Sequence, residues 1–436
     1  MKRRPACWKR RLTASLRGPE LPLLIMLLVV LVFRLLWSLQ AQAMTPDGEQ
    51  YDRMAHLFLQ SGTIAFNKVH VPSAFYSPGY PLFLAAVYAV FGANPSPLVA
   101  VRMAQALLSV VTLFVIFRIG VRLHSRTLGW MAVFLGALYP ALTFANQFIL
   151  TEVLFTFLLC LLVLVGLRLI DAPSKKEALL FGVVLAACCH VRPTILLWGF
   201  VPFLFLLRQV PLRRLALLSV VGLAAFVLVM SPWWVRNAVV FDRFVPFNTS
   251  SANPLLTGTY TMFGQSLAPN EIYAPWTWSP EERLTKDDPK EELALNDEWR
   301  RQALERLEQQ LRTEPGKVVW LRLVALGNAF GGPDMSWVLP ERLQAGVNVI
   351  HRLLLLFAAV GFALNLRDRK WASILALVVY YVGAHVVILM LTRYMFPLMP
   401  LVLVASGYGL MAVGGEIRRV WTERWPFRRW AAGRYA

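Results

Sequence analysis

Long apolar runs separated by short polar segments dominate this chain. A helix of about 20 apolar residues matches the thickness of a bilayer core, so the pattern predicts an all-α polytopic membrane protein. About ten runs can be laid alternately across the membrane. The predicted spans are 21–40, 99–119, 127–146, 149–168, 177–190, 192–208, 213–234, 343–364, 371–391 and 394–414.

Two further apolar runs are too short to cross a bilayer. We expect 82–91 and 318–330 to lie in the headgroup plane as interfacial helices. The polar segments 41–98 and 235–342 form two loops on the outer side. Within the second loop, apolar residues recur at helical spacing among charges, which predicts an amphipathic helix whose charges carry no chemistry. These residues are Leu295, Trp299, Ala303, Leu307 and Leu311.

Composition and charge agree with this topology. Hydrophobic residues make up 57% of the 436 positions, and the mean hydropathy is +0.54, more apolar surface than a soluble fold can bury. The formal net charge of +19 does not indicate nucleic-acid binding, because the excess lies in short loops on one side, as the positive-inside rule expects. The predicted cytoplasmic segments are 1–20, 118–126, 168–177, 208–214, 365–370 and 415–436, which hold 25 Lys and Arg against six Asp and Glu.

These assignments divide the chain and orient it in a plasma (inner) membrane with both termini cytoplasmic. The predicted parts are a basic tail 1–20, a first transmembrane helix 21–40, a catalytic outer loop 41–98, a transmembrane bundle 99–234, a second outer loop 235–342, C-terminal transmembrane helices 343–414 and a basic tail 415–436. Ala41-Gln42-Ala43 resembles a signal-peptide cleavage site. We expect an uncleaved anchor instead, since the preceding run is long enough to span the membrane.

Charged residues near the apolar runs gather at the outer face. Glu152, Arg192, Arg236 and Arg393 all fall there when the runs are threaded alternately. Charges at such positions are costly and are functional candidates by default. A guanidinium offers a planar fork suited to phosphate oxygens, although any one of these arginines also fits the role of a snorkelling anchor. The grouping predicts a site for an anionic lipid headgroup.

Carboxylates at the same face offer acid–base chemistry. Asp47 follows Pro46 directly after the first span, where it can act as a general base or simply cap the helix expected from Gln50 to Leu59. Glu152 can orient an acceptor or pair with an arginine. Together with Asp52, these carboxylates are also candidates for holding a divalent cation, though their spacing does not require one. The sequence contains no phosphate-binding glycine loop, zinc-ligand spacing or Gly-x-Ser-x-Gly motif.

A set of short motifs resembles the GT-C superfamily, and more narrowly the family 39-type transferases, which include protein O-mannosyltransferases and the lipid A aminoarabinose transferase. The motifs run in order along nearly the whole chain. They are Pro46-Asp47 with Tyr51, Ser77-Pro78-Gly79-Tyr80-Pro81, Arg102 with Gln105, Tyr139-Pro140 with Thr151-Glu152, Val191-Arg192-Pro193, Trp233-Trp234-Val235-Arg236-Asn237, Glu314-Pro315-Gly316, and Arg393-Tyr394 with Pro397 and Pro400.

The resemblance implies a GT-C-like helical bundle that transfers a sugar from a polyprenyl-phosphate carrier to an extracytoplasmic glycolipid or protein. By motif position, Asp47 would be the catalytic aspartate. Glu152 and Asp52 would serve as acceptor-site or second carboxylates. The expected lipid-phosphate and donor residues are Arg192, Arg236, Arg393, Tyr394, Arg102 and Tyr80. One departure concerns the residue before the Pro-Gly-Tyr-Pro turn, which is basic in many relatives, whereas Tyr76 and Ser77 precede the turn here.

Two alternatives remain at this stage. A flippase or transporter of lipid-linked glycans would use the arginines to hold phosphate in transit, and would be expected to carry polar residues through the membrane midplane. Apart from Arg34, the middles of the runs are apolar, which favours the transferase. A non-catalytic partner in a cell-envelope complex is the third hypothesis.

Overall fold

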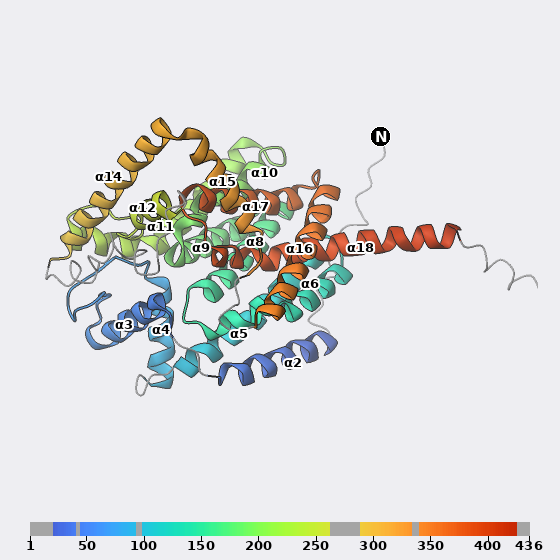
Figure 1. Cartoon of the computed structure of the whole chain (residues 1–436), viewed down its shortest axis with the longest axis horizontal. Helices are drawn as coiled ribbons and strands as arrows, with labels where there is room; N and C mark the ends of the chain where they lie inside the picture. Colours follow the sequence, from blue (N-terminus) through green and yellow to red (C-terminus); the bar gives the residue numbers. More distant parts are fainter. Residues whose placement is uncertain (1–20, 41–43, 93–97, 262–287, 334–339, 425–436) are drawn as a thin grey trace, which may run out of the picture.

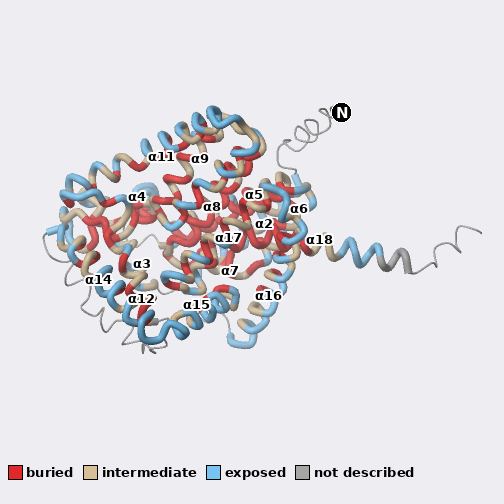
Figure 2. Tube along the Cα trace, turned by 90° about the horizontal axis from the view of Figure 1, so that it is seen from above, coloured by how far each residue is buried: buried red, intermediate tan, exposed pale blue. Residues whose placement is uncertain are grey.

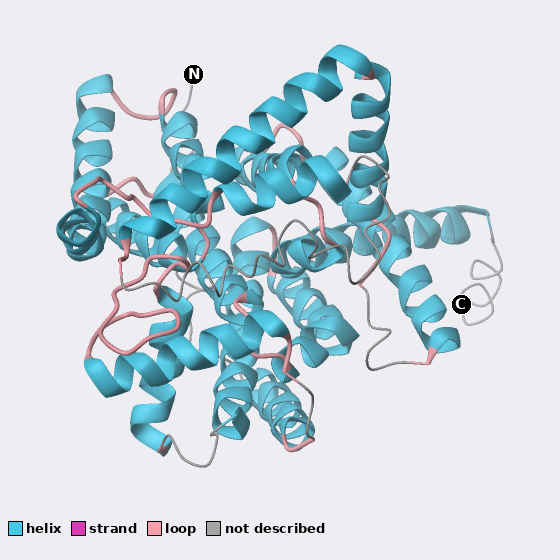
Figure 3. Ribbon diagram, turned by 60° about the vertical axis from the view of Figure 1, so that its left-hand side comes forward, coloured by secondary structure: helices cyan, strands magenta, loops and turns pink. Residues whose placement is uncertain are grey.

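The described part of the protein is helical throughout. The computed structural model describes residues 21–40, 44–92, 98–261, 288–333 and 340–424, and within these ranges the backbone forms helices joined by loops, with one isolated bridge between Ala65 and Pro72 (Figures 1 and 3). The predicted tail 1–20, Ala41-Gln42-Ala43 and the last part of the tail 415–436 lie outside the described residues.

The helices follow one another with short connections. In the first half they are α2 (Leu21–Ser38), α3 (Pro46–Ser61), α4 (Gly79–Phe91), α5 (Leu98–Leu123), α6 (Arg126–Leu138), α7 (Pro140–Phe144), η1 (Ala145–Gln147), α8 (Glu152–Asp171), α9 (Lys175–Val191), η2 (Pro193–Phe200) and α10 (Val201–Leu206). In the second half they are α11 (Leu212–Phe241), α12 (Ala252–Thr261), α14 (Lys290–Thr313), α15 (Pro315–Ala329), α16 (Glu341–Leu364), α17 (Arg369–Ile388), η3 (Thr392–Leu398) and α18 (Met399–Arg424).

Eight of the ten predicted spans correspond to structures long and apolar enough to cross a membrane. Seven are helices with an unbroken apolar window, and the eighth is α6 with α7 and η1, bent by 67° at Pro140. The polytopic all-α class is confirmed. The other two predicted spans, 177–190 and 192–208, form shorter helices. The 17 residues of α9 cover only about 25 Å at 1.5 Å per residue, less than the roughly 30 Å of a hydrocarbon core.

Local sequence determines where these helices begin and end. Ser174 caps α9 by accepting a hydrogen bond from the Glu177 amide. Asp368 caps α17 in the same way through two amides, as expected for short polar side chains at a helix N-terminus. Pro193 comes two residues after the end of α9 at Val191, and since proline cannot continue the helical hydrogen-bond pattern, the chain turns into η2.

The span α8 lies at the centre of the bundle and, with the last span Thr392–Arg419, is the most buried. Two thirds of its apolar window is buried (67%), against 22% for α2 at the periphery. Its neighbours α5 and α9 are also largely buried, whereas the end of α18 extends away as an exposed helix (Figure 2). In Figure 1, α3, α4, α12 and α14 gather at the left end of the molecule, and α18 runs out at the right.

The two outer segments pack against each other at that left end. Met54 of α3 and Phe75 of the following loop share a small apolar core with Leu256 of α12 and Trp299 of α14. The predicted amphipathic helix is present as α14. It buries its stripe from Leu295 through Trp299 and Ala303. The stripe does not continue to Leu311, which is 48% exposed in the last turn of the helix.

The two short apolar runs also form helices. Residues 82–91 lie in α4, which begins three residues earlier, at Gly79. Residues 318–329 lie in α15, with Phe330 directly after its end. Their interfacial position stays a prediction. The outward face of α15 is apolar, with Trp320 63% exposed, which is consistent with a helix that lies on lipid.

Candidate active site

The first turn of α3 presents Asp47 at the left end of the bundle. The helix begins at Pro46, and its N-cap is Thr45, whose hydroxyl accepts the Gly48 amide at 3.1 Å. The alternative prediction that Asp47 caps the helix is therefore wrong. Because Thr45 satisfies the free amide, the Asp47 carboxylate is available for other contacts, and its place in the first turn suits the positive end of the helix dipole.

A glycine brings this turn close to the start of α8. A Cβ added to Gly48 would stand 3.0 Å from the carbonyl oxygen of Ile149 and 3.2 Å from the hydroxyl of Thr45. Since Ile149 lies three residues before Glu152, this close approach brings the turn that carries Asp47 towards the beginning of the buried span α8. The absence of a side chain at position 48 thus helps to bring the two carboxylates together.

Two ion pairs form the centre of the site. Arg393 at the start of η3 contacts Asp47, with 2.7 Å between Nη2 and Oδ2. Arg192 after α9 contacts Glu152, with 2.8 Å between Nη2 and Oε1. Arg192 also donates to the Thr151 hydroxyl from Nε at 2.9 Å and from Nη2 at 2.6 Å. The proposal that Glu152 pairs with an arginine is confirmed.

The two pairs differ in burial. The side chains of Arg393 and Asp47 are 41% and 37% exposed, whereas those of Arg192 and Glu152 are 15% and 7% exposed. Arg393 also lies within electrostatic range of Glu152. The site therefore has a partly exposed pair, Asp47 with Arg393, and a buried pair, Glu152 with Arg192. The Arg393 guanidinium interacts with both carboxylates.

Aromatic side chains form the walls of this centre. The Tyr394 ring centroid lies 5.6 Å from the Arg192 guanidinium carbon and 5.7 Å from that of Arg393. Tyr51, one turn after Asp47 on α3, is a further member. Burial holds the pKa of its phenol well above the usual value. The charges of Asp47 and Glu152 add to this effect, which locates the phenol close to both pairs.

Three further residues of the predicted site make hydrogen bonds to neighbouring protein groups. Arg102 is buried and donates from Nε to the Gln147 carbonyl at 3.0 Å. The Tyr80 hydroxyl donates to Gln105 at 2.9 Å, and its ring packs against Tyr51. Asp52 accepts a hydrogen bond from Tyr88 and lies 3.6 Å from His56. These contacts occupy Arg102 and Asp52 with neighbouring protein groups.

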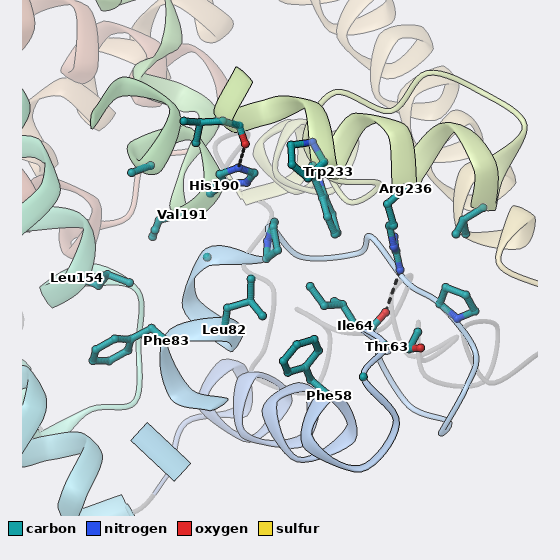
Figure 4. A pocket seen from close by; sticks show the side chains of 18 of the residues that line it. Phe58, Thr63, Ile64, Leu82, Phe83, Leu154, His190, Val191, Trp233 and Arg236 are labelled. Atoms are coloured by element: carbon teal, nitrogen blue, oxygen red, sulfur yellow. Dashed lines mark hydrogen bonds between the residues drawn. The ribbon is translucent and has the colours of Figure 1, made fainter. Parts of the chain in front are cut away.

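Arg236 takes part in neither of these two ion pairs and lines a cavity of about 820 Å³. The cavity is bounded by the loop between α3 and α4, by α8, and by the ends of α9 and α11 (Figure 4). Its walls are mostly apolar, and Arg236 and His190 are its basic side chains. Arg236 donates to the Ile64 carbonyl at 3.0 Å and lies over the Trp233 ring, 4.8 Å from its centroid.

The Pro-Gly-Tyr-Pro turn borders both the cavity and the ion pairs. Pro78 and Gly79 line the cavity beside Val191, the residue that precedes Arg192. A Cβ at Gly79 would come within 2.7 Å of the His190 carbonyl oxygen, so only glycine permits α4 to start this close to the end of α9. The cavity is thereby adjacent to the buried ion pair.

The sequence predicts that the charged residues of α14 have no chemical role. One of them, Glu292, is buried and makes specific contacts. Its carboxylate is buried at 6% exposure. It accepts the Ala74 amide at 3.0 Å and the Thr249 hydroxyl at 2.8 Å. Burial raises the pKa of Glu292, while these donors and the nearby Arg236 oppose the shift. Position 292 precedes Leu295 by three residues, so helical periodicity places it on the buried face of α14.

The carboxylates do not gather into a metal site. Across the ranges described, no group of three His, Cys, Asp or Glu side chains is placed to hold a metal ion. Asp47 and Glu152 have arginines as their partners, while Asp52 accepts a hydrogen bond from Tyr88.

Fold and site together define a polytopic helical membrane protein with paired carboxylates and arginines at one end. Residues 73–235 match the family described as "Dolichyl-phosphate-mannose-protein mannosyltransferase". None of the curated proteins compared with the chain matches it.

Solved structures share the fold. The oligosaccharyltransferase AglB from Archaeoglobus fulgidus, in complex with an inhibitory peptide and a dolichol-phosphate, is 15% identical, with 92% of this chain and 52% of that chain covered and a TM-score of 0.52. The apo form of the Archaeoglobus fulgidus enzyme gives 14% identity, 91% and 52% coverage and a TM-score of 0.51. ArnT from Cupriavidus metallidurans, bound to undecaprenyl phosphate, gives 16%, 92%, 80% and 0.44.

The present chain thus spans about half the length of the archaeal oligosaccharyltransferase. The family match and this fold confirm the predicted resemblance to the GT-C superfamily of membrane glycosyltransferases.

Proposed function

We propose that this protein is an inverting glycosyltransferase that moves a sugar from a polyprenyl-phosphate donor to an extracytoplasmic acceptor, a glycolipid or a protein. The observation that supports it best is the Asp47–Arg393 pair, which joins a candidate base to a candidate phosphate ligand at 2.7 Å. The pair is partly exposed. An apolar cavity adjoins the neighbouring buried pair, since Val191, the residue before Arg192, lines it.

The donor lipid fits the cavity that carries Arg236. Its apolar walls suit an isoprenoid chain, and the guanidinium at its edge suits the phosphate. Arg236 lines the same cavity as Pro78 and Gly79. It therefore supplies a cation near the turn, where Tyr76 and Ser77 stand instead of the basic residue found in many relatives. The matched family description and the dolichol-phosphate complex of AglB support a donor of this class.

In the proposed reaction, an acceptor oxygen or nitrogen attacks the anomeric carbon of the sugar. The new bond forms as the bond from that carbon to the phosphate oxygen breaks, and polyprenyl phosphate leaves as an anion. Asp47 accepts the proton of the acceptor as general base. Arg192 and Arg393, with Tyr394 beside them, stabilise the negative charge that develops on the leaving phosphate.

We place this site at the outer face of a plasma (inner) membrane, with both chain ends cytoplasmic. The distribution of basic loops supports this orientation. Asp47 and Arg393 are then reached by acceptors outside the cytoplasm, and the donor enters from the outer leaflet through the cavity.

Reconstitution into vesicles with a labelled polyprenyl-phosphate sugar tests the proposal. We expect label to move to an envelope glycolipid or protein acceptor, and polyprenyl phosphate to be released in equal amount. Movement of the intact labelled lipid across the vesicle membrane without transfer would instead establish a flippase.

A further inference from the structure

Basic side chains from four helices converge at the other end of α8, away from the ion-paired site. Because α8 begins at Glu152 and ends at Asp171, its two ends are separated by roughly 28 Å at 1.5 Å per residue. The cluster consists of Arg118 and Arg122 of α5, Arg126 of α6, Arg168 of α8 and Lys370 of α17. We call it the Arg118 cluster.

Among the described residues, Asp171 and Glu177 form ion pairs with three members of this cluster. Asp171 contacts Arg122 at 2.6 Å and Lys370 at 3.7 Å. Glu177 contacts Arg168 at 2.6 Å. Even without Arg126, the four cations Arg118, Arg122, Arg168 and Lys370 outnumber these two carboxylates in the described part of the chain. This leaves an excess of positive charge where α5, α8 and α17 meet.

Arg118 is the least compensated member. It is half-buried, and across the described part of the chain it makes no ion pair or hydrogen bond. Arg122 lies one turn further along the same face of α5, and the cations Arg168 and Arg126 are also within electrostatic range. Like charges that are partly removed from water repel each other with less screening than exposed ones do. An anion bound here would remove this repulsion.

We propose that the Arg118 cluster binds the phosphate headgroup of an anionic phospholipid. Arg118 lies five residues before the end of the span α5, about 8 Å along the helix, which is a depth suited to a lipid phosphate. Guanidinium groups bind phosphate oxygens in a bidentate manner. With the orientation given above, the cluster faces the inner leaflet, where anionic lipids are attracted to basic pockets between transmembrane helices.

This site is distinct from the candidate active site and does not depend on glycosyl transfer. The purified full-length protein in neutral detergent is titrated with phosphatidylglycerol, and bound lipid is counted by native mass spectrometry while thermal unfolding is followed in parallel. We expect phosphatidylglycerol to bind and to raise the melting temperature, and phosphatidylcholine to do neither.

Arg118→Gln should weaken phosphatidylglycerol binding about tenfold or more. In the absence of lipid, this variant should melt at or above the wild-type temperature, because it removes the repulsion. Arg118→Lys keeps the charge without the planar fork and should bind at an intermediate level. Arg369→Gln, which removes an exposed cation at the first position of α17, is the matched control and should bind as wild type does.

Two results would overturn the proposal. Equal weakening by Arg118→Gln and Arg369→Gln would show only diffuse attraction to a basic surface. If inorganic phosphate alone reproduced the whole thermal shift and blocked the lipid, the site would belong to a soluble anion rather than to a phospholipid.

Discussion

The carboxylate of Asp47 and the guanidinium of Arg393 meet at 2.7 Å although 346 residues separate them in the chain. Asp47 lies in the first turn of α3, and Arg393 lies at the start of η3, just before the last span. Their contact leaves the outer part of the site electrically balanced before any substrate binds. In the proposed reaction, substrates take over these interactions, the donor phosphate at Arg393 and the acceptor at Asp47.

The role of Asp47 can be tested with an isosteric substitution. Asp47→Asn keeps the size of the side chain but removes the base, so the rate of transfer should fall about 10²- to 10⁴-fold. Initial rates with a labelled polyprenyl-phosphate sugar measure the change. Glu49→Gln is the control, because Glu49 lies two residues further along the same helix and is exposed. Wild-type rates for Asp47→Asn would remove this residue from the mechanism.

Arg236 provides a separate test of the donor cavity. Arg236→Gln should raise the KM for the lipid-linked donor about 10- to 100-fold, because a hydrogen bond to a charged group contributes about 1.5–3 kcal/mol. The KM for the acceptor should change little. Arg243→Gln removes an exposed arginine that pairs with Asp297 and should leave both constants unchanged. A larger effect on acceptor KM than on donor KM would contradict the assignment of the cavity.

The buried pair of Glu152 and Arg192 should contribute to stability as well as to chemistry. Glu152→Gln leaves the Arg192 guanidinium largely buried without a counter-charge, a change that typically costs about 3–5 kcal/mol. The thermal unfolding midpoint in detergent should fall accordingly. In the double variant Glu152→Gln with Arg192→Gln, stability should recover in part while transfer stays low. Additive losses in the double variant would argue against direct coupling of these two residues.

Glu292 leads to a prediction about pH. Because burial raises the pKa of its carboxyl in the folded protein, the ionised form costs stability, and this cost grows as the pH rises through the folded pKa. Glu292→Gln is always neutral and keeps an acceptor for Ala74 and Thr249. The variant should therefore melt above the wild type at pH 7, and the difference should shrink as the pH approaches the unfolded pKa near 4.5.

Thermal scans of both proteins between pH 4 and pH 8 test this expectation, with Glu308→Gln as the control, since Glu308 is 61% exposed on the same helix. A melting difference that does not change with pH would show that Glu292 acts only through the shape of its side chain.

Helix positions were largely predictable from the sequence because apolar length and proline or capping residues determine them locally. The exceptions, α9 and η2, show the limit of this approach. The sequence places a break between two spans at Pro193, but the elements on either side, α9 with 17 residues and η2 with eight, are shorter than a membrane span. Hydropathy alone does not predict where an α-helix ends within an apolar run or where a 3-10 helix follows it.

Within the site, the sequence identified which charges matter but not their partners. The grouping of Glu152, Arg192 and Arg393 at one face was predictable from span order, whereas the pairing of each arginine with its carboxylate depends on the packing of distant helices. The role of Asp47 was ambiguous because an aspartate can be either a helix cap or a general base. The hydrogen bond from the Gly48 amide to the Thr45 hydroxyl shows that Thr45 is the cap. Arg102 carries the same charge as the site arginines, yet it is occupied by backbone carbonyls.

The order in which the chain is synthesised gives the position of Arg393 a further consequence. The carboxylates are made early, but their outer counter-charge reaches the membrane only with the final hydrophobic segment. A nascent or truncated chain that stops before that segment lacks half of the outer pair, so under the proposed mechanism catalytic competence arises only at the last stage of membrane insertion.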